Sequence, residues 1–361
     1  MLRGYVYFCA HPQPPVALEA VTIKDIARAL NLSTSTVSRA LRDSYEISAD
    51  TKRLVMDYAG RLNYQPNPVA LSLKENRSRV LGVIVPQIAN NFFSQAINGI
   101  EAVAYERGYH VIIMQTHESL EREILTVQQA VARRVDGLLI SISSQTTNVA
   151  HLQAIQQRNV PIVMFDRVSA EMDTPKIVAD NFGGSFAATE HLIQTGRRRI
   201  AFVAIPPFMA ITQDRLAGYR AALNHYGLPY DDDLVDFVGF DEHELAPVID
   251  KLLNLPHPPD AFFMAFDRLA LWCMTALRNR GVAIPEQVSL IGFTNISVAD
   301  LLDPPMSTVV QPAQEIGQTA AERLIELIEL KQKSPAPLPD RPNPVIIPNK
   351  LFIRESTRRI V

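Results

Sequence analysis

Residues 21–42, VTIKDIARALNLSTSTVSRALR, restrict the fold more than any other stretch, because they carry the spacing of two short helices joined by a break at Asn31 and Leu32. Apolar residues recur at the spacing of a helix that buries one face: Ile23, Ile26, Ala27 and Leu30 in the first segment, and Val37, Ala40 and Leu41 in the second. Thr22 is expected to cap the first helix in a capping box with Asp25, and Ser33 to cap the second helix.

The second helix of this pair leaves a polar face formed by Thr34, Ser35, Ser38, Arg39 and Arg42. In a DNA-binding helix-turn-helix, the start of the second helix reaches base edges in the major groove while cations hold phosphates. The pattern fits that role. It also fits a helical hairpin that never touches DNA, in which the serines and threonines at the helix start are only caps.

A third helix and a very short fourth helix are expected next. Leu54, Tyr58 and Leu62, with Val55, predict a helix that begins near residue 48 and ends at residues 63–66. Asn67 and Pro68 then suit the cap and first position of a helix of barely two turns over residues 69–74. So short a helix is unstable alone in water, so it needs either a second copy of itself or DNA.

Charge is distributed unevenly along the 361 residues, which carry a formal charge of −3. Residues 21–79 hold ten Lys/Arg and six Asp/Glu, a balance of +4, so the rest of the chain carries −7. A basic module on an acidic body favours a polyanionic partner at one end of the chain. The length predicts two or three structural units.

Cys9 and Cys273 are the only cysteines, which excludes a disulfide framework or a cysteine-rich zinc site and fits a reducing cytoplasm. No apolar run is long enough to cross a bilayer. Residues 1–20 could be argued to be a secretory signal, but their apolar stretch is brief and interrupted by His11 and prolines. A disordered extension, or translation from an upstream start codon, is the expected reading.

Residues 21–41, together with Leu62-Asn63-Tyr64, Pro66-Asn67, Ala70 and Leu73, resemble the headpiece and hinge of the lac repressor/galactose repressor family of bacterial regulators. The resemblance continues to residue 361. It implies a cytoplasmic, homodimeric repressor that binds a pseudo-palindromic double-stranded DNA operator. In this family the paired hinge helices enter the minor groove, where a leucine is wedged between base steps.

By position that leucine is Leu73, although the same residue could instead be an ordinary buried leucine with no DNA contact. The resemblance also implies that Thr34, Ser35 and Arg39 read the bases. The full set of DNA contacts implied by the resemblance is Thr22, Ser33, Thr34, Ser35, Thr36, Ser38, Arg39, Asn67, Ala70 and Leu73.

From residue 80 onward, short apolar runs alternate with helix-length amphipathic segments, which predicts buried parallel strands in doubly wound α/β layers. One series of strands is expected at 80–85, 111–114, 137–142 and 160–165, and a second at 176–179, 200–204, 234–238, 261–265 and 288–292. The resemblance implies two lobes of the periplasmic sugar-binding type. The expected division is 1–20 extension, 21–66 headpiece, 67–79 hinge, 80–180 with 311–340 first lobe, and 181–310 with 341–361 second lobe.

Ligands of open α/β sheets bind beyond the carboxyl ends of the strands, where this chain places carboxylates, arginines and aromatic rings. Such groups suit a small, carbohydrate-like effector, whose hydroxyls both donate and accept hydrogen bonds. The expected effector-binding residues are Phe92, Phe93, Asp166, Arg167, Arg215, Asp241, Asp267 and Thr294, with Asn90, Asn91, Asp180, Asn181 and Gln311 nearby. A helix cap is the alternative role for a strand-end aspartate, and it is expected for Asp267 and Asp214.

Three departures from the family pattern leave the effector open. Thr294 stands where many members carry Asp, Phe266 where Asn often precedes Asp267, and Met209 where some nucleobase-binding members have a basic residue. A sugar, a sugar phosphate, a nucleobase or a partner protein all fit.

Two other classes of protein fit the sequence less well. Phosphate-loop, dinucleotide, His-Glu-x-x-His and Gly-x-Ser-x-Gly motifs are absent, and the spacing of Ser143, His151 and Asp166 does not support a hydrolase, so neither catalysis nor a metal or other cofactor is expected. A periplasmic-type binding module without DNA function explains the α/β body, but it leaves the basic headpiece unexplained.

Overall fold

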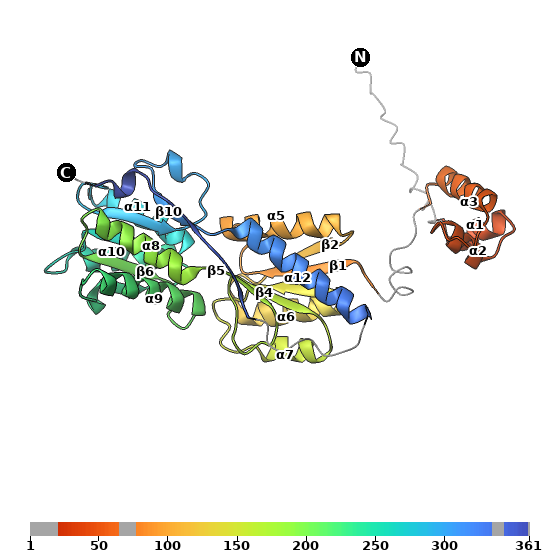
Figure 1. Cartoon of the computed structure of the whole chain (residues 1–361), viewed down its shortest axis with the longest axis horizontal. Coiled ribbons are helices and arrows are strands. Elements are labelled where there is room, and N and C mark those ends of the chain that lie inside the picture. Colours follow the sequence, from red (N-terminus) through yellow and green to blue (C-terminus); the bar gives the residue numbers. More distant parts are fainter. Residues whose placement is uncertain (1–20, 65–76, 334–342, 360–361) are drawn as a thin grey trace, which may run out of the picture. The chain divides into compact units, whose positions relative to one another are not determined.

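The computed structural model describes residues 21–64, 77–333 and 343–359, and these form two compact units that meet in sequence between Ser78 and Arg79. The first unit is all helical, with α1 (Ile23–Ala29), α2 (Thr34–Ala40) and α3 (Ala49–Arg61) (Figure 1). Its core consists of six buried side chains, two from each helix: Ile26, Ala27, Val37, Ala40, Val55 and Ala59.

The three predicted helix starts of this unit are confirmed. The Thr22 hydroxyl accepts from the Asp25 amide while the Asp25 carboxylate accepts from the Thr22 amide, which completes the capping box. Ser33 caps α2 and Ser48 caps α3 in the same manner. Asn31 takes the left-handed conformation, with φ of 52°, and so turns the chain between α1 and α2.

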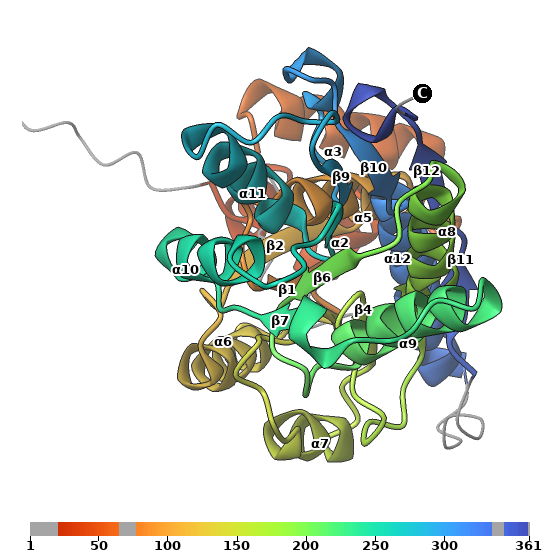
Figure 2. The same ribbon diagram turned by 90° about the vertical axis from the view of Figure 1, so that its left-hand side faces the viewer.

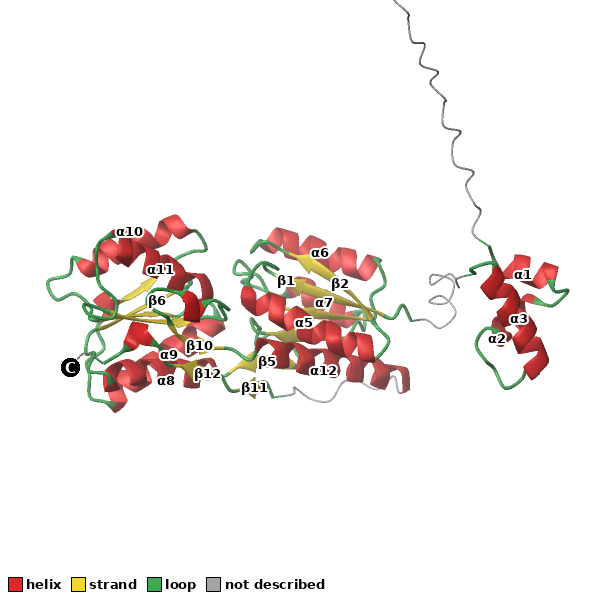
Figure 3. Cartoon of the chain, turned by 90° about the horizontal axis from the view of Figure 1, so that it is seen from above, coloured by secondary structure: helices red, strands yellow, loops and turns green. Residues whose placement is uncertain are grey.

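The second unit contains two six-stranded sheets, each in one lobe (Figure 3). The first sheet has the order β11-β5-β4-β3-β1-β2, and all its strands are parallel. Its elements are β1 (Val80–Val85), α5 (Asn91–Glu106), β2 (His110–Gln115), α6 (Leu120–Ala132), β3 (Gly137–Ile140), α7 (Ala150–Gln157), β4 (Ile162–Phe165), β5 (Lys176–Ala179), α12 (Ala313–Lys333) and β11 (Val345–Ile347).

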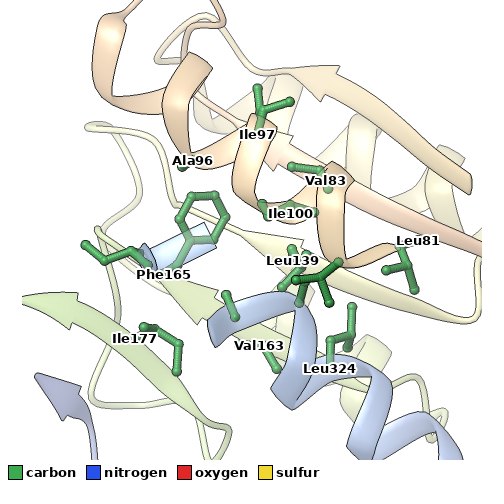
Figure 4. Packing of buried hydrophobic residues seen from close by; sticks show 14 of the residues in the cluster. Leu81, Val83, Ala96, Ile97, Ile100, Leu139, Val163, Phe165, Ile177 and Leu324 are labelled. Atoms are coloured by element: carbon green, nitrogen blue, oxygen red, sulfur yellow. The ribbon is translucent and has the colours of Figure 1, made fainter. Parts of the chain in front are cut away.

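Helices cover both faces of the first sheet, as a doubly wound layer requires. α5 and α12 bury one face, where Ile100 and Leu324 lie over Leu139 and Val163 (Figure 4). α6 and α7 bury the other face. At the crossing of α5 and α12, a Cβ on Gly317 would lie 2.0 Å from the carbonyl oxygen of Ala96, so glycine permits this close approach.

The second sheet has the order β12-β10-β9-β8-β6-β7, and its edge strand β12 runs antiparallel to β10. α8 and α9 cover one face, and α10 and α11 cover the other (Figure 2). The elements are α8 (Asn181–Gln194), β6 (Ile200–Ala204), α9 (Ala210–His225), β7 (Val235–Phe237), α10 (Glu242–Leu253), β8 (Ala261–Met264), α11 (Asp267–Asn279), β9 (Ser289–Phe293), β10 (Ser307–Val310) and β12 (Lys350–Phe352), with short 3-10 turns at Asp232–Leu234, Ala299–Leu301 and Glu355–Thr357. The predicted fold class is thus confirmed.

The assignment of all residues after 341 to the second lobe is wrong for β11. This strand pairs in parallel with β5 of the first sheet, and Ile347 is buried in the first core. Pro348 lacks an amide donor and the Asn349 side chain donates to the Asp180 carbonyl at 2.7 Å, so β11 ends there and the chain changes sheets before β12. The chain therefore passes between the lobes three times, after β5, β10 and β11.

Candidate functional site

The outward face of α2 in the headpiece is polar. Thr34, Ser35 and Arg39 are exposed, whereas Val37 and Ala40 on the opposite face are buried. Arg39 Nη1 lies 3.0 Å from Glu46 Oε2, and both side chains are about half exposed, so solvent weakens this pair and leaves the guanidinium able to change partner.

The other predicted DNA contacts in the headpiece have structural partners as well. The Ser33 hydroxyl caps Thr36 and lies 2.7 Å from the Ser35 hydroxyl. The Ser38 hydroxyl accepts from Arg42 Nη2 at 3.1 Å. Thr22 is engaged in the capping box. Asn67, Ala70 and Leu73 lie outside the described residues.

In the second unit, a cleft between the lobes is bordered by the segments that follow the strands of both sheets. A cavity of about 270 Å³ has hydroxyl-bearing residues of the first lobe on one side and apolar residues of the second lobe on the other: Ser143, Thr146, Thr147 and Ser169 against Phe208, Met209 and Ile211. A second cavity of about 440 Å³ is lined by Asn90, Asn91, Asp267, Arg268, Trp272 and Thr294, among others.

Between these cavities lies a tightly packed region with only about 10 Å³ of free space. It contains Phe93, Glu118, Arg167, Phe240 and Trp272. Arg167 also lines the first cavity, and Trp272 also lines the second, so the three spaces form one series along the cleft.

Asp166 and Arg167, which follow β4, are both buried, and Arg167 lines the cleft. Asp166 has a φ of 58°, and its Oδ1 accepts from Gln311 Nε2 at 3.4 Å. Burial raises the pKa of the Asp166 carboxyl above its usual range, although Arg167 and Arg215 nearby oppose that shift.

Arg215 enters from α9 and is 2% exposed. Its Nε donates to Asn181 Oδ1 at 2.9 Å, its Nη1 donates to the Ala265 carbonyl, and its guanidinium stacks 3.6 Å from the centre of the Phe293 ring. Burial lowers the pKa of Arg215 to about 9. Nη2 is buried with no hydrogen-bond partner among the described residues, so this nitrogen can still bind an acceptor.

The structure corrects the cap predictions for two aspartates. Asp267 is the first residue of α11, but its Oδ1 accepts from the Thr294 hydroxyl and from the Asn295 amide, because the segment that follows β9 places both donors beside it. Asp214 lies inside α9, which begins at Ala210 rather than at residue 214. Burial raises the pKa of Asp267 above its usual range.

Of the other predicted effector contacts, Phe93 and Thr294 also line the cleft. Phe92 packs against Phe93 in the core of the first lobe, and Asp241 is exposed and caps α10 by accepting from the His243 amide. Sequence reasoning missed Glu118, Phe240 and Trp272. Glu118 and Phe240 follow β2 and β7, so the strand-end rule could have found them, whereas Trp272 on α11 had no such signal.

Ser143, His151 and Asp166 do not form a hydrolase site, because the first two are engaged elsewhere. The Ser143 hydroxyl lies 2.9 Å from the Thr146 hydroxyl, and His151 Nε2 lies 2.9 Å from the fully buried Glu123. Glu123 also accepts from the Ser143 amide at 2.6 Å, so it fixes the loop that lines the cleft. Among the described residues, no group of three His, Cys, Asp or Glu side chains could hold a metal, and no helix is long and apolar enough to cross a membrane.

A capped three-helix unit with a polar α2 face, joined in sequence to a two-lobed α/β body with a cleft, defines a DNA-binding regulator with a ligand-binding domain. Residues 22–67 match the description "Bacterial regulatory proteins, lacI family", and residues 78–355 match "Periplasmic binding proteins and sugar binding domain of LacI family". The chain belongs to the LacI family of bacterial transcription regulators.

Curated relatives include the HTH-type transcriptional repressor CytR of Escherichia coli (strain K12), which is 34% identical over 311 residues, covering 86% of this chain and 90% of the relative. The repressor PurR of Vibrio atlanticus is 33% identical over 310 residues, covering 86% of this chain and 92% of the relative. The structure resembles the lac repressor dimer bound to operator and the anti-inducer ONPF, with a TM-score of 0.81 at 25% identity over 94% of this chain and all of that one.

Proposed function

We propose that this chain represses transcription without catalysis, in the cytoplasm and as a homodimer, by placing α2 of each subunit in the major groove of a pseudo-palindromic operator. Thr34, Ser35 and Arg39 read bases, because they are the exposed polar side chains of α2 opposite its buried face. Ser33, Thr36 and Ser38 shape that face, and Thr22 holds the start of α1 near the phosphates. Asn67, Ala70 and Leu73 belong to the same proposal as minor-groove contacts of the hinge over residues 67–79.

Base reading by Arg39 is tested by selecting binding sites from random DNA with the full chain and with Arg39→Ala. Loss of a base-contacting arginine costs about 1–3 kcal/mol and relaxes the preference at one position of each half-site. Arg61→Ala, an exposed arginine at the end of α3, is the matched control and should preserve the selected sequence. An Arg39→Ala protein that selects the same sequence as the parent would show that Arg39 reads no base.

The effector we propose is a sugar derivative that carries an apolar group. Hydroxyls of Ser143, Thr146 and Ser169 on the first-lobe wall suit the hydroxyls of a sugar. The second-lobe wall is an apolar cluster of Ile205, Met209, Ile211, Phe240 and Phe266. Against this wall, the hydroxyls of a free sugar would be left without hydrogen bonds.

Charged and polar groups then orient this ligand. Arg215 Nη2 supplies a buried donor without a partner, and Asp166 supplies a carboxylate beside it. Asp267 and Thr294, which are hydrogen-bonded to each other, line the second cavity. Phe93 and Arg167 line the packed region between the two cavities, and Phe92 and Asp241 support the site from the starts of α5 and α10. Ligand binding would change the lobe arrangement and thereby operator affinity, a coupling worth about 1–3 kcal/mol in typical regulators.

A thermal-shift screen tests this ligand class with free sugars paired against their phenyl glycosides and nucleosides. A ligand at a hundred times its dissociation constant adds about 2.7 kcal/mol to the free energy of unfolding. The substituted member of a pair should stabilise the chain, and Met209→Gln, which places an amide in the apolar wall, should reduce that gain. A free sugar that stabilises as well as its glycoside would refute the apolar contact.

A binding module without DNA function is the second candidate, favoured by the body alone. Fluorescence anisotropy with genomic duplex fragments at low and physiological salt separates the two candidates. A protein that binds every duplex with equal affinity, or none, would contradict sequence-specific regulation.

A further inference from the structure

Arg167 occupies an unusual position for a cation. Its side chain is 3% exposed, and it lies in the packed region of the cleft rather than in solvent. A buried guanidinium is stable only where other groups replace its hydration. The groups that do so come from both lobes.

The first lobe supplies the counter-charge. Arg167 Nη1 donates to both oxygens of Glu118, at 2.9 and 2.8 Å, and Glu118 Oε2 also accepts from the Ser144 amide at 2.8 Å. The Glu118 side chain is 12% exposed, so water screens this charge-assisted pair weakly. The guanidinium is therefore anchored to the loops that follow β2 and β3.

The second lobe supplies aromatic faces. The guanidinium carbon lies 5.4 Å from the ring centres of both Phe240 and Phe266, and 5.7 Å from the ring of Phe93 in the first lobe. All three distances are within the range of a cation–π contact, which is stronger when water is excluded. Phe240 and Phe266 meet edge to face at 5.7 Å and belong to the apolar wall of the second lobe, so they are held in place without Arg167.

We propose that Arg167 is an internal latch between the lobes. Its charge is neutralised in the first lobe, and its faces are covered by rings of the second lobe, so separating the lobes would expose the guanidinium and both rings to water. The latch is a property of the body alone, but its regulatory role rests on the proposed effector function. Separating Arg167 from the rings of Phe240 and Phe266 changes the lobe arrangement that sets operator affinity.

A purely structural ion pair is the competing interpretation. In that case Arg167 would matter only to the first lobe, and the rings of the second lobe would tolerate substitution without any effect that depends on Arg167. A double-mutant cycle across the cleft separates the two interpretations, because it measures whether Arg167 and Phe240 act together.

The experiment uses the full chain without added ligand and compares Arg167→Met, Phe240→Leu and the double variant. Trp272, the only tryptophan, lines the same part of the cleft, so acrylamide quenching of its fluorescence reports opening. Hydrogen exchange of residues 141–147, on the opposite wall, gives a second readout that does not depend on Phe240 packing near Trp272. Arg158→Met, an exposed arginine at the end of α7, is the control.

Each single cleft variant should increase quenching and exchange, and the double variant should show less than the sum of the two effects. The Arg158→Met control should match the parent. Additive effects, or no change in either readout, would overturn the latch. Arg167→Met leaves the Glu118 carboxylate without its cation, so the cycle is repeated in a Glu118→Gln background. The non-additivity between Arg167 and Phe240 should persist there, because that background has no unpaired carboxylate to cause it.

Operator affinity of the same variants is measured by fluorescence anisotropy and tests the regulatory role separately. A latch that biases the DNA-binding arrangement should change the operator dissociation constant about 5- to 150-fold, the span of typical allosteric coupling. Non-additive opening with unchanged operator affinity would keep the latch and reject coupling between the cleft and DNA. Unchanged opening together with effector-dependent DNA binding would reject the latch and keep the proposed function.

Discussion

The headpiece should unfold when one buried aliphatic side chain is truncated, because its core is very small. Ile26 has no exposed surface and shares its cluster with five other buried residues, against which partly buried side chains such as Leu30 and Leu41 pack. An Ile→Ala change in a core costs about 2–5 kcal/mol, through lost burial and the cavity left behind. Domains carry roughly 0.05–0.15 kcal/mol of stability per residue, so a unit of this size has a total of roughly 2–7 kcal/mol. At the middle of both ranges, Ile26→Ala removes most of it.

The assay follows the two units separately. Hydrogen exchange should show residues 21–64 unprotected in Ile26→Ala, while the two-lobed body retains the protection of the parent, because the units have separate cores. Operator binding should disappear although no proposed DNA contact has changed.

Two variants calibrate this result. Ile26→Val costs about 0.5–1.5 kcal/mol and should leave a folded, DNA-binding headpiece. Thr34→Ala, at an exposed position, should keep the fold but lose base preference. A protected headpiece in Ile26→Ala would refute the reasoning, because it would mean that the six-residue core is not what holds α1 to α2 and α3.

Two other predictions concern the body. Gly317→Ala places a Cβ 2.0 Å from the Ala96 carbonyl oxygen, so α5 and α12 must separate. We expect the free energy of unfolding, measured by urea denaturation, to fall by about 1–3 kcal/mol. Gly60→Ala, where the added Cβ meets no atom within 4 Å, is the control. Burial lowers the pKa of His191, whose Nε2 lies 2.8 Å from the Thr357 hydroxyl. The stability that the neutral ring contributes is therefore present above its unfolded pKa, about 6.5, and is lost as the pH falls from there toward the folded pKa. His191→Gln should flatten that acid loss in a series of unfolding curves, and an identical pH profile would contradict the assignment.

The headpiece could be predicted closely from the sequence because its signals are local. Thr22, Ser33 and Ser48 each cap a helix through an atom within three residues, so a short stretch of sequence contains both the hydroxyl and the amide that it satisfies. The periodic burial of Ile26 and Val37 follows from the same short range. The stripe predicted for the third helix is wrong in part: Leu54 and Leu62 are exposed, and α3 instead turns Val55 and Ala59 toward α1 and α2.

The edge strand β11 and the cleft were harder to predict, because their contacts join residues far apart in the chain. β11 has three residues, and what places it in the first sheet is pairing with β5, more than 160 residues earlier. Glu118 and Phe240 become neighbours of Arg167 only when loops from different strands, and from different lobes, are brought together. Position after a strand could identify candidates, but it could not tell which of them meet.

Asp267 and Thr294 show how one such meeting changes the chemistry of a site. An aspartate after a strand can cap the next helix, bind a ligand hydroxyl or accept donors from a neighbouring strand. Here the Thr294 hydroxyl and the Asn295 amide both donate to Asp267 Oδ1, so that oxygen is satisfied within the protein. An aspartate at 294, the residue typical of the family pattern, would place a second buried carboxylate beside the first and oppose it. Thr294 therefore removes one carboxylate and engages the other internally, which makes this end of the cleft a poorer acceptor of sugar hydroxyls and favours a ligand held by its apolar group and by Arg215.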